Sequence, residues 1–314
     1  MTATAFDPRL TFGTAVEKLA ETNDKIVVLS ADSGRSSGFG GYISKFPERY
    51  LEFGIEEQGV TGVASGLATT GAVPIFCAIA PFVTCRNFEQ FRNDLGYMNQ
   101  DVKIVGRNGG FTYADLGATH HSLEDYAIIS MIPGVVILAP QDATEITDAV
   151  TAMVDHHGPV YMRLGSAGVP ALFEPGTFRI GQGRRRTIGD TVTVVSTGYV
   201  TPATVEAVDQ LVDEGIRVEH LCLGTVQPLD KELILGSAVK TRHVITVEEH
   251  YDRGGLGGSV AELLAGTGVA VLDRVAVPHG YVPSGPYADV LRKYGLDVPG
   301  IASKIAGFVR DRAK

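Results

Sequence analysis

Short apolar runs rich in β-branched residues alternate with helical patterns along almost the whole chain. Several runs are apolar at consecutive positions, which is typical of strands buried on both faces. We therefore expect a mostly parallel sheet with helices on both sides. The strands predicted in the first half are Lys25–Ser30, Tyr50–Gly54, Val73–Ala78, Val102–Gly106, Val135–Leu138 and Val160–Arg163.

Between these strands, apolar residues recur at helical spacing. They stand at positions 60, 63, 64, 67 and 68, and Gly71 follows where a C-cap glycine belongs. Asp142 is a predicted N-cap, and apolar residues at 143, 146, 150, 153 and 154 form one face of the next helix. This strand–helix–strand repetition predicts a doubly wound α/β domain.

The alternation pauses between Gly165 and Asp190, a stretch rich in Gly and Pro that we interpret as a linker with one hairpin. It resumes with strands predicted at Thr191–Thr197, Arg217–Leu223, His243–Val247 and Val269–Leu272 and a helix at Pro202–Leu211. We predict two doubly wound α/β domains, residues 1–170 and 191–314, joined by residues 171–190. The three arginines at 184–186 form a solvated face or, as the less favoured alternative, an anion site.

The charge balance argues against two classes of partner. The 314 residues include 27 Lys and Arg against 36 Asp and Glu, a formal net charge of −9, whereas nucleic acids and anionic membranes attract clustered positive charge. The longest nearly apolar stretch, Met131 to Pro140, is about half as long as a bilayer span. Asp7 and Arg9 interrupt the start of the chain before a signal-peptide core. We expect a soluble, cytoplasmic protein.

Cysteine and histidine patterns predict neither a disulfide framework nor metal ligands. The chain has an odd number of cysteines, at Cys77, Cys85 and Cys222, and no two of them form a CxxC motif. The adjacent histidines at 120–121 and 156–157 lack the spacings of zinc sites.

Two segments that follow predicted strands are candidates for chemistry, because ligands of open α/β sheets bind beyond the carboxyl ends of the strands. The first is Phe53-Gly54-Ile55-Glu56-Glu57-Gln58-Gly59, whose acidic residues have the alternative role of complementing a helix dipole. The second is the long loop 109–125, which is alternatively a turn-rich connection with locally bonded histidines. Neither segment decides the question alone.

Taken together and in order, FGIEEQ, AIAPFVTCRNFEQFRNDL and VKIVGRNGG…GATHHSLEDYAIISMIPGVVILAPQDATE resemble the thiamine diphosphate enzymes of the transketolase family. More narrowly, the chain is similar to the C-terminal section of a split transketolase, which some organisms encode as a separate chain. The resemblance extends from about Leu10 to about Ala306. It implies a pyrimidine-binding domain followed by the C-terminal α/β domain of the family.

The resemblance gives Glu57 the role of the family's catalytic glutamate, with Glu56 as the competing position. A carboxyl group shielded from water can share a proton with the aminopyrimidine ring of the cofactor and so promote attack on a ketose carbonyl. Phe82 and Phe88 lie where the family places aromatic rings against that pyrimidine, and core packing is the alternative for both. Arg86 either reaches the substrate channel or pairs with a carboxylate.

Three more residues are matched to substrate contacts. His120 matches the histidine of the family's Thr-His-Gln motif, which implies hydrogen bonding and proton transfer at a substrate oxygen. Arg163 matches an arginine that binds sugar phosphate through its planar fork of donors. Leu116 stands where the family commonly has an aspartate for a sugar hydroxyl, so Asp115 is the candidate replacement. With no second phosphate arginine near Phe12, the sequence leaves open whether the substrates are phosphorylated.

Nothing in the sequence resembles the Gly-Asp-Gly…Asn motif that holds magnesium and the diphosphate in this family. Gly189-Asp190-Thr191 lacks the second glycine, and the glycine-rich run 254–259 lacks the spacing of a nucleotide-binding loop and is predicted to be a strand–helix turn. The resemblance therefore implies that a separate α chain holds Mg²⁺ and the diphosphate. Thiamine diphosphate would then lie at the interface of an α2β2 heterotetramer.

The leading hypothesis is the β component of a two-chain transketolase that moves a two-carbon ketol unit from a ketose donor to an aldose acceptor, with sugars or sugar phosphates as substrates. The alternatives are the β subunit of a 2-oxo acid dehydrogenase, a 1-deoxyxylulose-5-phosphate synthase-like enzyme, and a catalytically silent partner subunit. The joint presence of Glu57, Phe82 and His120 argues against the last of these.

Overall fold

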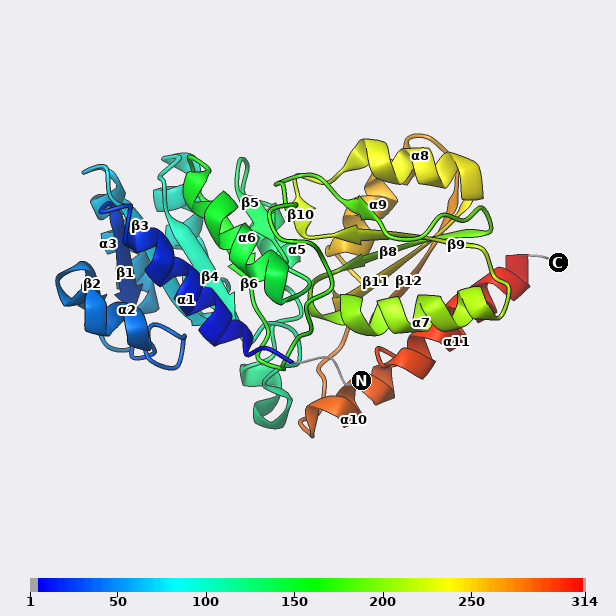
Figure 1. The fold of residues 1–314 in the computed structure, drawn as a ribbon, viewed down its shortest axis with the longest axis horizontal. Helices are drawn as coiled ribbons and strands as arrows, with labels where there is room; N and C mark the ends of the chain where they lie inside the picture. Colours follow the sequence, from blue (N-terminus) through cyan, green and yellow to red (C-terminus); the bar gives the residue numbers. More distant parts are fainter. Residues whose placement is uncertain (1–4, 313–314) are drawn as a thin grey trace.

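Two α/β domains lie side by side along the long axis of the molecule (Figure 1). The computed structural model describes residues 5–312. Each domain is a mostly parallel sheet with helices on both faces, which confirms the predicted fold class. In this described range, no helix is both long enough and apolar enough to cross a membrane.

The first sheet has seven strands in the order β10-β5-β6-β4-β3-β1-β2, all parallel except β10. The six strands predicted for this domain are confirmed, with no end shifted by more than two residues. In chain order they are β1 (Ile26–Ser30), β2 (Tyr50–Glu52), β3 (Val73–Ile79), β4 (Lys103–Arg107), β5 (Val136–Leu138) and β6 (Val160–Arg163). Their carboxyl ends share one edge, where the candidate segments emerge.

Apolar side chains on both faces of this sheet bury two cores. On one face, α1 (Pro8–Ala20) and α6 (Ala143–Asp155) pack through residues such as Phe12 and Ile146. On the other face, α3 (Glu57–Ala68) and α5 (Asp125–Ser130) pack through Val60 and Ile129. The helical spacing read from the sequence after Tyr50–Gly54 and after Asp142 is therefore correct. The short helices α2 (Gly40–Lys45) and α4 (Phe88–Gln90) complete the domain.

The second sheet has five strands in the order β12-β11-β8-β9-β7. Its parallel strands are β8 (Val192–Thr197), β9 (Val218–Leu223), β11 (His243–Tyr251) and β12 (Val271–Val277). One face is covered by α7 (Thr201–Asp213), α10 (Tyr287–Tyr294) and α11 (Val298–Arg312), and the other by α8 (Lys231–Thr241) and α9 (Leu256–Ala265) (Figure 1).

One strand crosses between the predicted domains. Strand β10 (Thr225–Gln227) follows β9 in the chain but pairs antiparallel with β5, opposite Leu138. The sheet of the first domain is thus completed by residues that the sequence assigned to the second, so the predicted boundaries do not separate the two sheets. Three residues carry too short a pattern to reveal this pairing.

The three arginines at 184–186 form ion pairs with carboxylates of the chain itself. Strand β7 (Arg184–Arg185) pairs antiparallel with β9 rather than forming the predicted local hairpin. Its two guanidinium groups pair with the buried carboxylates of Glu145 and Glu219, and Arg186 pairs with Asp209 at 2.7 Å. The run therefore ties the connecting segment to both domains, and its donors face protein acids rather than a bound anion.

Candidate active site

Glu57 is the first residue of α3 and is buried, with 4% of its surface exposed. The turn before it is braced by Glu52, which accepts hydrogen bonds from the amides of Asp32 at 2.7 Å and Gly54 at 2.9 Å. Burial acts to raise the pKa of Glu52, but hydrogen bonds including these two outweigh it and lower the pKa to about 2. The exposed Glu56 caps the helix by accepting from the amide of Gly59 at 3.3 Å, so the buried carboxyl is the one at 57.

Arg86 lies between Glu57 and Phe82. Its Nη1 donates to Glu57 Oε2 at 2.7 Å, and its guanidinium carbon lies 4.1 Å from the centre of the Phe82 ring. Of the two roles that the sequence left open, the structure shows the pairing with a carboxylate. The other oxygen, Glu57 Oε1, makes no hydrogen bond within the described chain and is free to accept one from a ligand.

His120 reaches the same group from the long loop. Its ring meets Phe82 edge-on at 5.4 Å and Tyr113 at 5.9 Å between ring centres. Its Nδ1 lies 2.9 Å from the hydroxyl of Thr119, so Nε2 is the nitrogen left for a substrate. The structure thus brings Glu57, Phe82, Arg86 and His120 together from three separate segments.

The second domain holds the loop that carries His120. Phe111 is fully buried in the core of that domain and stacks on Tyr294 of α10, with ring centres 5.7 Å apart. The amide of Phe111 donates to Glu249 Oε1, and the hydroxyl of Tyr287 donates to Glu249 Oε2 at 2.9 Å. Burial raises the pKa of Glu249. The position of His120 therefore depends on contacts between the two domains.

A cavity of about 180 Å³ opens beside Glu57 and Phe82 at the carboxyl ends of β1 and β3. The remaining lining residues are Ala31, Asp32, Ser33, Ile55, Ala78, Ile79 and Arg107. An aromatic ring, aliphatic walls and one buried carboxyl with a free oxygen suit a flat heteroaromatic ring that carries a nitrogen base. These residues fit the pyrimidine half of thiamine diphosphate.

Arg107 is a site residue that the sequence reasoning missed. It ends β4, is 3% exposed, and donates to the hydroxyls of Ser36, Ser37 and Tyr113 and to the side-chain oxygen of Asn108. An arginine at the carboxyl end of a predicted strand, in VKIVGRNGG, was the available signal.

Two predicted residues lie apart from this cavity. Phe88 packs against the hydrophobic core beneath α3, as in its structural alternative, and does not line the cavity. Asp115 is exposed and its side chain makes no hydrogen bond with the described residues, and the neighbouring Leu116 is 49% exposed. Their predicted ligand contacts stay predictions.

Arg163 is held between the two domains. Its Nη1 lies 3.4 Å from Asp125 Oδ1, its Nη2 donates to the carbonyl of Glu249 at 2.7 Å, and its guanidinium stacks on Tyr126 at 4.6 Å. Only 6% of the residue is exposed. These bonds engage two of the five N–H groups of the guanidinium, and the expected phosphate contact stays a prediction.

The glycine-rich run 254–259 is a strand–helix turn, as predicted, and the start of α9 is already occupied. Glu248 accepts from the amides of Leu256 at 2.7 Å and Gly257 at 2.6 Å, which are the amides a phosphate would use.

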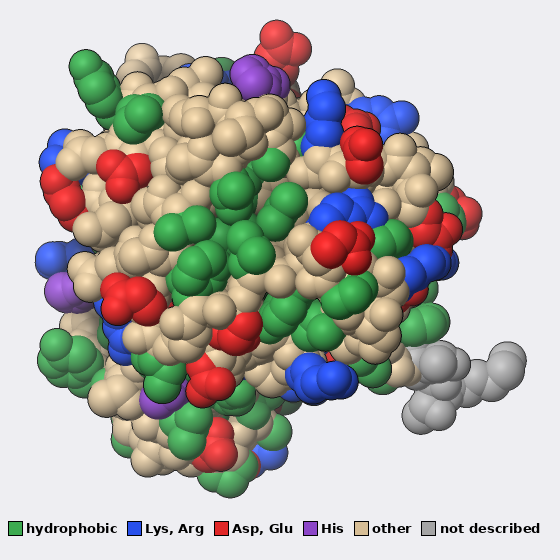
Figure 2. Space-filling view, turned by 90° about the vertical axis from the view of Figure 1, so that its left-hand side faces the viewer, with side chains coloured by type: hydrophobic (Ala, Val, Ile, Leu, Met, Phe, Trp, Pro, Cys, Tyr) green, Lys and Arg blue, Asp and Glu red, His purple; other side chains and the backbone are tan. Residues whose placement is uncertain are grey.

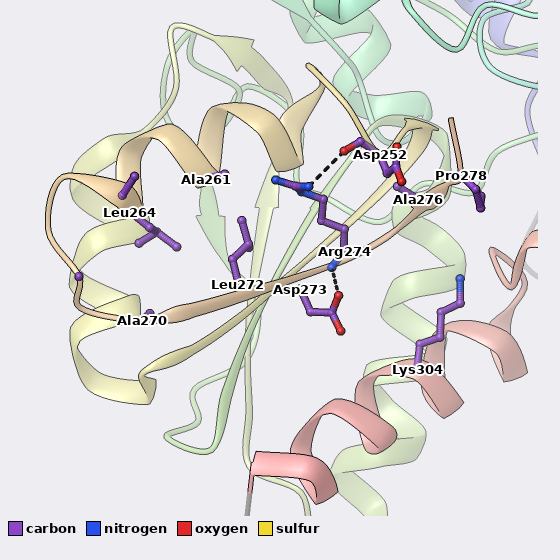
Figure 3. Close-up of a pocket in the computed structure, with 12 residues that line it drawn as sticks. Asp252, Ala261, Leu264, Ala270, Leu272, Asp273, Arg274, Ala276, Pro278 and Lys304 are labelled. Carbon is purple, nitrogen blue, oxygen red and sulfur yellow. Dashed lines mark hydrogen bonds between the residues drawn. The ribbon is translucent and has the colours of Figure 1, made fainter. Parts of the chain in front are cut away.

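A larger hollow of about 610 Å³ lies beside the edge strand β12, between α9 and α11 (Figure 3). Arg274 donates there to the carbonyl of Asp252 at 3.2 Å, and Lys304 to the carbonyl of Tyr294 at 2.8 Å. None of the predicted site residues lines this hollow.

Comparison with known proteins identifies the family of both domains. The model of the transketolase pyrimidine-binding domain matches residues 5–169, and that of the transketolase C-terminal domain matches residues 181–301. One subunit of the apulose-4-phosphate transketolase of Phocaeicola vulgatus is 35% identical over 304 residues, which cover 96% of this chain and 97% of that subunit. 1-deoxy-D-xylulose-5-phosphate synthase 1 of Geobacter sulfurreducens is 34% identical over 304 residues, which cover 95% of this chain but 47% of the synthase.

A solved structure described as "Split gene transketolase, inactive beta4 tetramer" superposes with a TM-score of 0.90 at 35% identity, covering 97% of this chain and 99% of that one. The chain belongs to the thiamine diphosphate-dependent transketolase family of transferases. Within that family it corresponds in extent to the separately encoded β component of split transketolases, since these relatives match it nearly from end to end whereas the synthase matches over about half its length.

Proposed function

We propose that this chain is the β component of a two-chain transketolase that transfers a two-carbon ketol unit from a ketose to an aldose. The observation that supports this most directly is the cluster of four side chains beside one cavity. Glu57 and Phe82 line the cavity, Arg86 contacts both of them, and His120 packs against Phe82. When bound, thiamine diphosphate supplies the carbon nucleophile and the electron sink that protein side chains lack.

The side chains of this chain bind, orient and exchange protons. Glu57 would share a proton with a pyrimidine ring nitrogen through Oε1, while the bond from Arg86 to Oε2 fixes the orientation of the carboxyl. Phe82, which lines the cavity, would pack against the ring. His120 would hydrogen-bond the substrate oxygen through Nε2 and move a proton there, since its Nδ1 is engaged by Thr119.

The partner chain is proposed to cover the face beside the cavity. Ile55 lines the cavity yet is 73% exposed. One stripe of α3, at Gly59, Val63 and Gly66, is exposed and uncharged, which suits close packing against another helix. Figure 2 shows apolar side chains gathered across the middle of the face at this end of the molecule.

Mg²⁺ and the diphosphate are assigned to the α chain. Within residues 5–312, no group of three His, Cys, Asp or Glu side chains is placed to hold a metal ion. The proposal includes an α2β2 heterotetramer with sugar or sugar-phosphate substrates. It also includes a cytoplasmic location, which the three free thiols of Cys77, Cys85 and Cys222 support.

The test is titration of thiamine diphosphate with Mg²⁺ into this chain, alone and mixed with its α chain, followed by a ketol-transfer assay of the mixture. We expect binding and activity only in the mixture. Glu57→Gln should lower kcat by at least about 100-fold without preventing assembly, since it removes the proton carrier. The neighbouring Glu56→Gln keeps an acceptor for Gly59 and should retain activity.

Three outcomes would contradict the proposal. Wild-type turnover by Glu57→Gln would show that Glu57 does not have the proposed catalytic role. Tight cofactor binding by the chain alone would show that the cofactor site is not shared with an α chain. Consumption of pyruvate without ketol transfer would favour the synthase reaction.

A further inference from the structure

The hollow beside β12 contains charged groups whose hydrogen-bonding capacity the chain leaves mostly unused. The guanidinium of Arg274 has five N–H groups, and its one hydrogen bond within residues 5–312 runs from Nη1 to the carbonyl of Asp252 at 3.2 Å. The carboxylate of Asp252 accepts no hydrogen bond from the same range of residues, and neither side chain forms an ion pair there. A cation and an acid therefore line one hollow without partners.

One atom of each side chain is also shielded from solvent. Arg274 Nε and Asp252 Oδ1 are both buried and lack a hydrogen-bond partner within the described chain. The stem of Arg274 lies across Gly257 at the start of α9, where an added Cβ would come within 2.8 Å of Arg274 Cδ. Because buried donors and acceptors of native proteins are nearly always satisfied, these two atoms point to a partner that the chain does not supply.

Lys304 and Asp273 place a second cation and a second acid in the hollow. Lys304 Nζ donates to the carbonyl of Tyr294 at 2.8 Å, which leaves two of its three N–H groups. Asp273 Oδ1 accepts from the amide of Arg274 at 2.8 Å. Charged groups of both signs are therefore present in equal number.

The other end of the hollow is aliphatic. Figure 3 shows Ala261, Leu264 and Leu272 on the side of α9, and the charged side chains toward the carboxyl end of β12. Leu264 is 3% exposed and forms part of the core under α9, so this wall is fixed by packing. The hollow thus combines a charged end with an apolar end.

We propose that this hollow binds a free α-amino acid with an aliphatic side chain. The carboxylate of this ligand would pair with Arg274 and Lys304, its ammonium group with Asp252, and its side chain would pack against Leu264 and Leu272. A simple anion is repelled by the two acids and a simple cation by the two bases, so the charges favour a ligand that carries both signs.

The hollow is separate from the candidate active site, since the two cavities share no lining residue. A peptide strand added to the edge of β12 fits less well than a small ligand. Asp273 already occupies the amide of Arg274, and charged side chains on an edge strand oppose the addition of another strand.

Calorimetric titration of L-leucine into the full chain tests the site. Two analogues each remove one charge, because 4-methylpentanoate lacks the ammonium group and 3-methylbutylamine lacks the carboxylate. We expect leucine to bind with one molecule per chain. Each analogue should bind at least about tenfold more weakly, the loss expected for one hydrogen bond between charged groups.

Three variants assign the contacts. Arg274→Gln should weaken leucine binding at least about tenfold but leave the affinity for 3-methylbutylamine unchanged, because that analogue has no carboxylate. Asp252→Asn should weaken leucine binding to a similar extent but leave the affinity for 4-methylpentanoate unchanged. Ala261→Phe keeps every charge and fills the aliphatic end, so it should also weaken leucine binding.

Arg217→Gln is the matched control, because it removes a positive charge from an exposed ion pair that does not line the hollow and should not alter leucine binding. Melting temperatures identify any variant that fails to fold. Absence of saturable leucine binding, equal affinity for leucine and both analogues, or unchanged affinity in Arg274→Gln and Asp252→Asn would overturn the inference. None of these outcomes depends on whether the chain takes part in ketol transfer.

Discussion

Glu249 joins the second domain to the loop that carries His120, and its removal tests how that loop is positioned. Its carboxyl accepts from the amide of Phe111 and the hydroxyl of Tyr287, and its own carbonyl accepts from Arg163. The residue is 5% exposed, so water does not replace these bonds when the carboxyl is removed. We therefore expect Glu249→Ala to destabilise the chain and to weaken activity together.

The magnitude follows from the groups left without partners. Glu249→Ala leaves two buried donors unsatisfied, at about 1–3 kcal/mol each, so the free energy of unfolding should fall by about 2–6 kcal/mol. Glu249→Gln keeps one acceptor oxygen, so it should lose about 1–3 kcal/mol. Tyr287→Phe removes a single hydrogen bond and should lose about 1 kcal/mol.

Urea unfolding of the full chain at one fixed protein concentration measures these differences. Glu262→Ala is the control, because Glu262 is an exposed glutamate of the same domain and should change the free energy of unfolding by less than about 0.5 kcal/mol. A loss below about 1 kcal/mol for Glu249→Ala, or an unchanged kcat/KM in the two-chain enzyme, would refute the argument that this carboxyl holds the loop.

Three further predictions address the partner surface, the pH dependence and the aromatic residues. Nothing lies within 4 Å of a Cβ built on Gly66, so Gly66→Arg should leave the melting temperature of this chain unchanged but weaken α-chain binding at least tenfold in calorimetry, and equal affinity would contradict the docking face. Burial lowers the pKa of His220 from 6.5 to about 3, so the unfolded state binds more protons between these values and stability should fall by up to about 1.4 kcal/mol per unit as pH drops below 6.5. Urea unfolding of His220→Gln should show a flatter dependence, and an identical slope would exclude this histidine as the cause. Phe82→Leu should weaken thiamine diphosphate binding to the complex more than Phe88→Leu does, because only Phe82 lines the cavity.

The fold was predictable from the sequence because buried parallel strands and amphipathic helices produce strong local patterns. The run Val73–Ala78 is apolar throughout and forms a central strand of the first sheet. Strand β10 was missed because its pairing with β5 depends on residues about ninety positions apart in the chain, and three residues carry no periodicity.

The residues of the candidate site could not be predicted from local patterns in the sequence. Glu57, Phe82, Arg86 and His120 were identified only through ordered resemblance, because their proximity is a tertiary contact that local spacing does not encode. The same resemblance assigned Arg163 to a phosphate, and local spacing could not reveal that two of its donors bond to groups of both domains.

The crossing of β10 into the first sheet has a consequence for how the chain is made. Strand β5 is fully buried and stays unpaired on one edge until residue 227 has been synthesised, so the first sheet is incomplete on the ribosome while β8 and β9 are already emerging. A fragment cut at the predicted linker would expose that apolar edge to other chains and should aggregate. The smallest fragment that contains every strand of the first sheet ends after Gln227 and already includes β7, β8 and β9 of its neighbour.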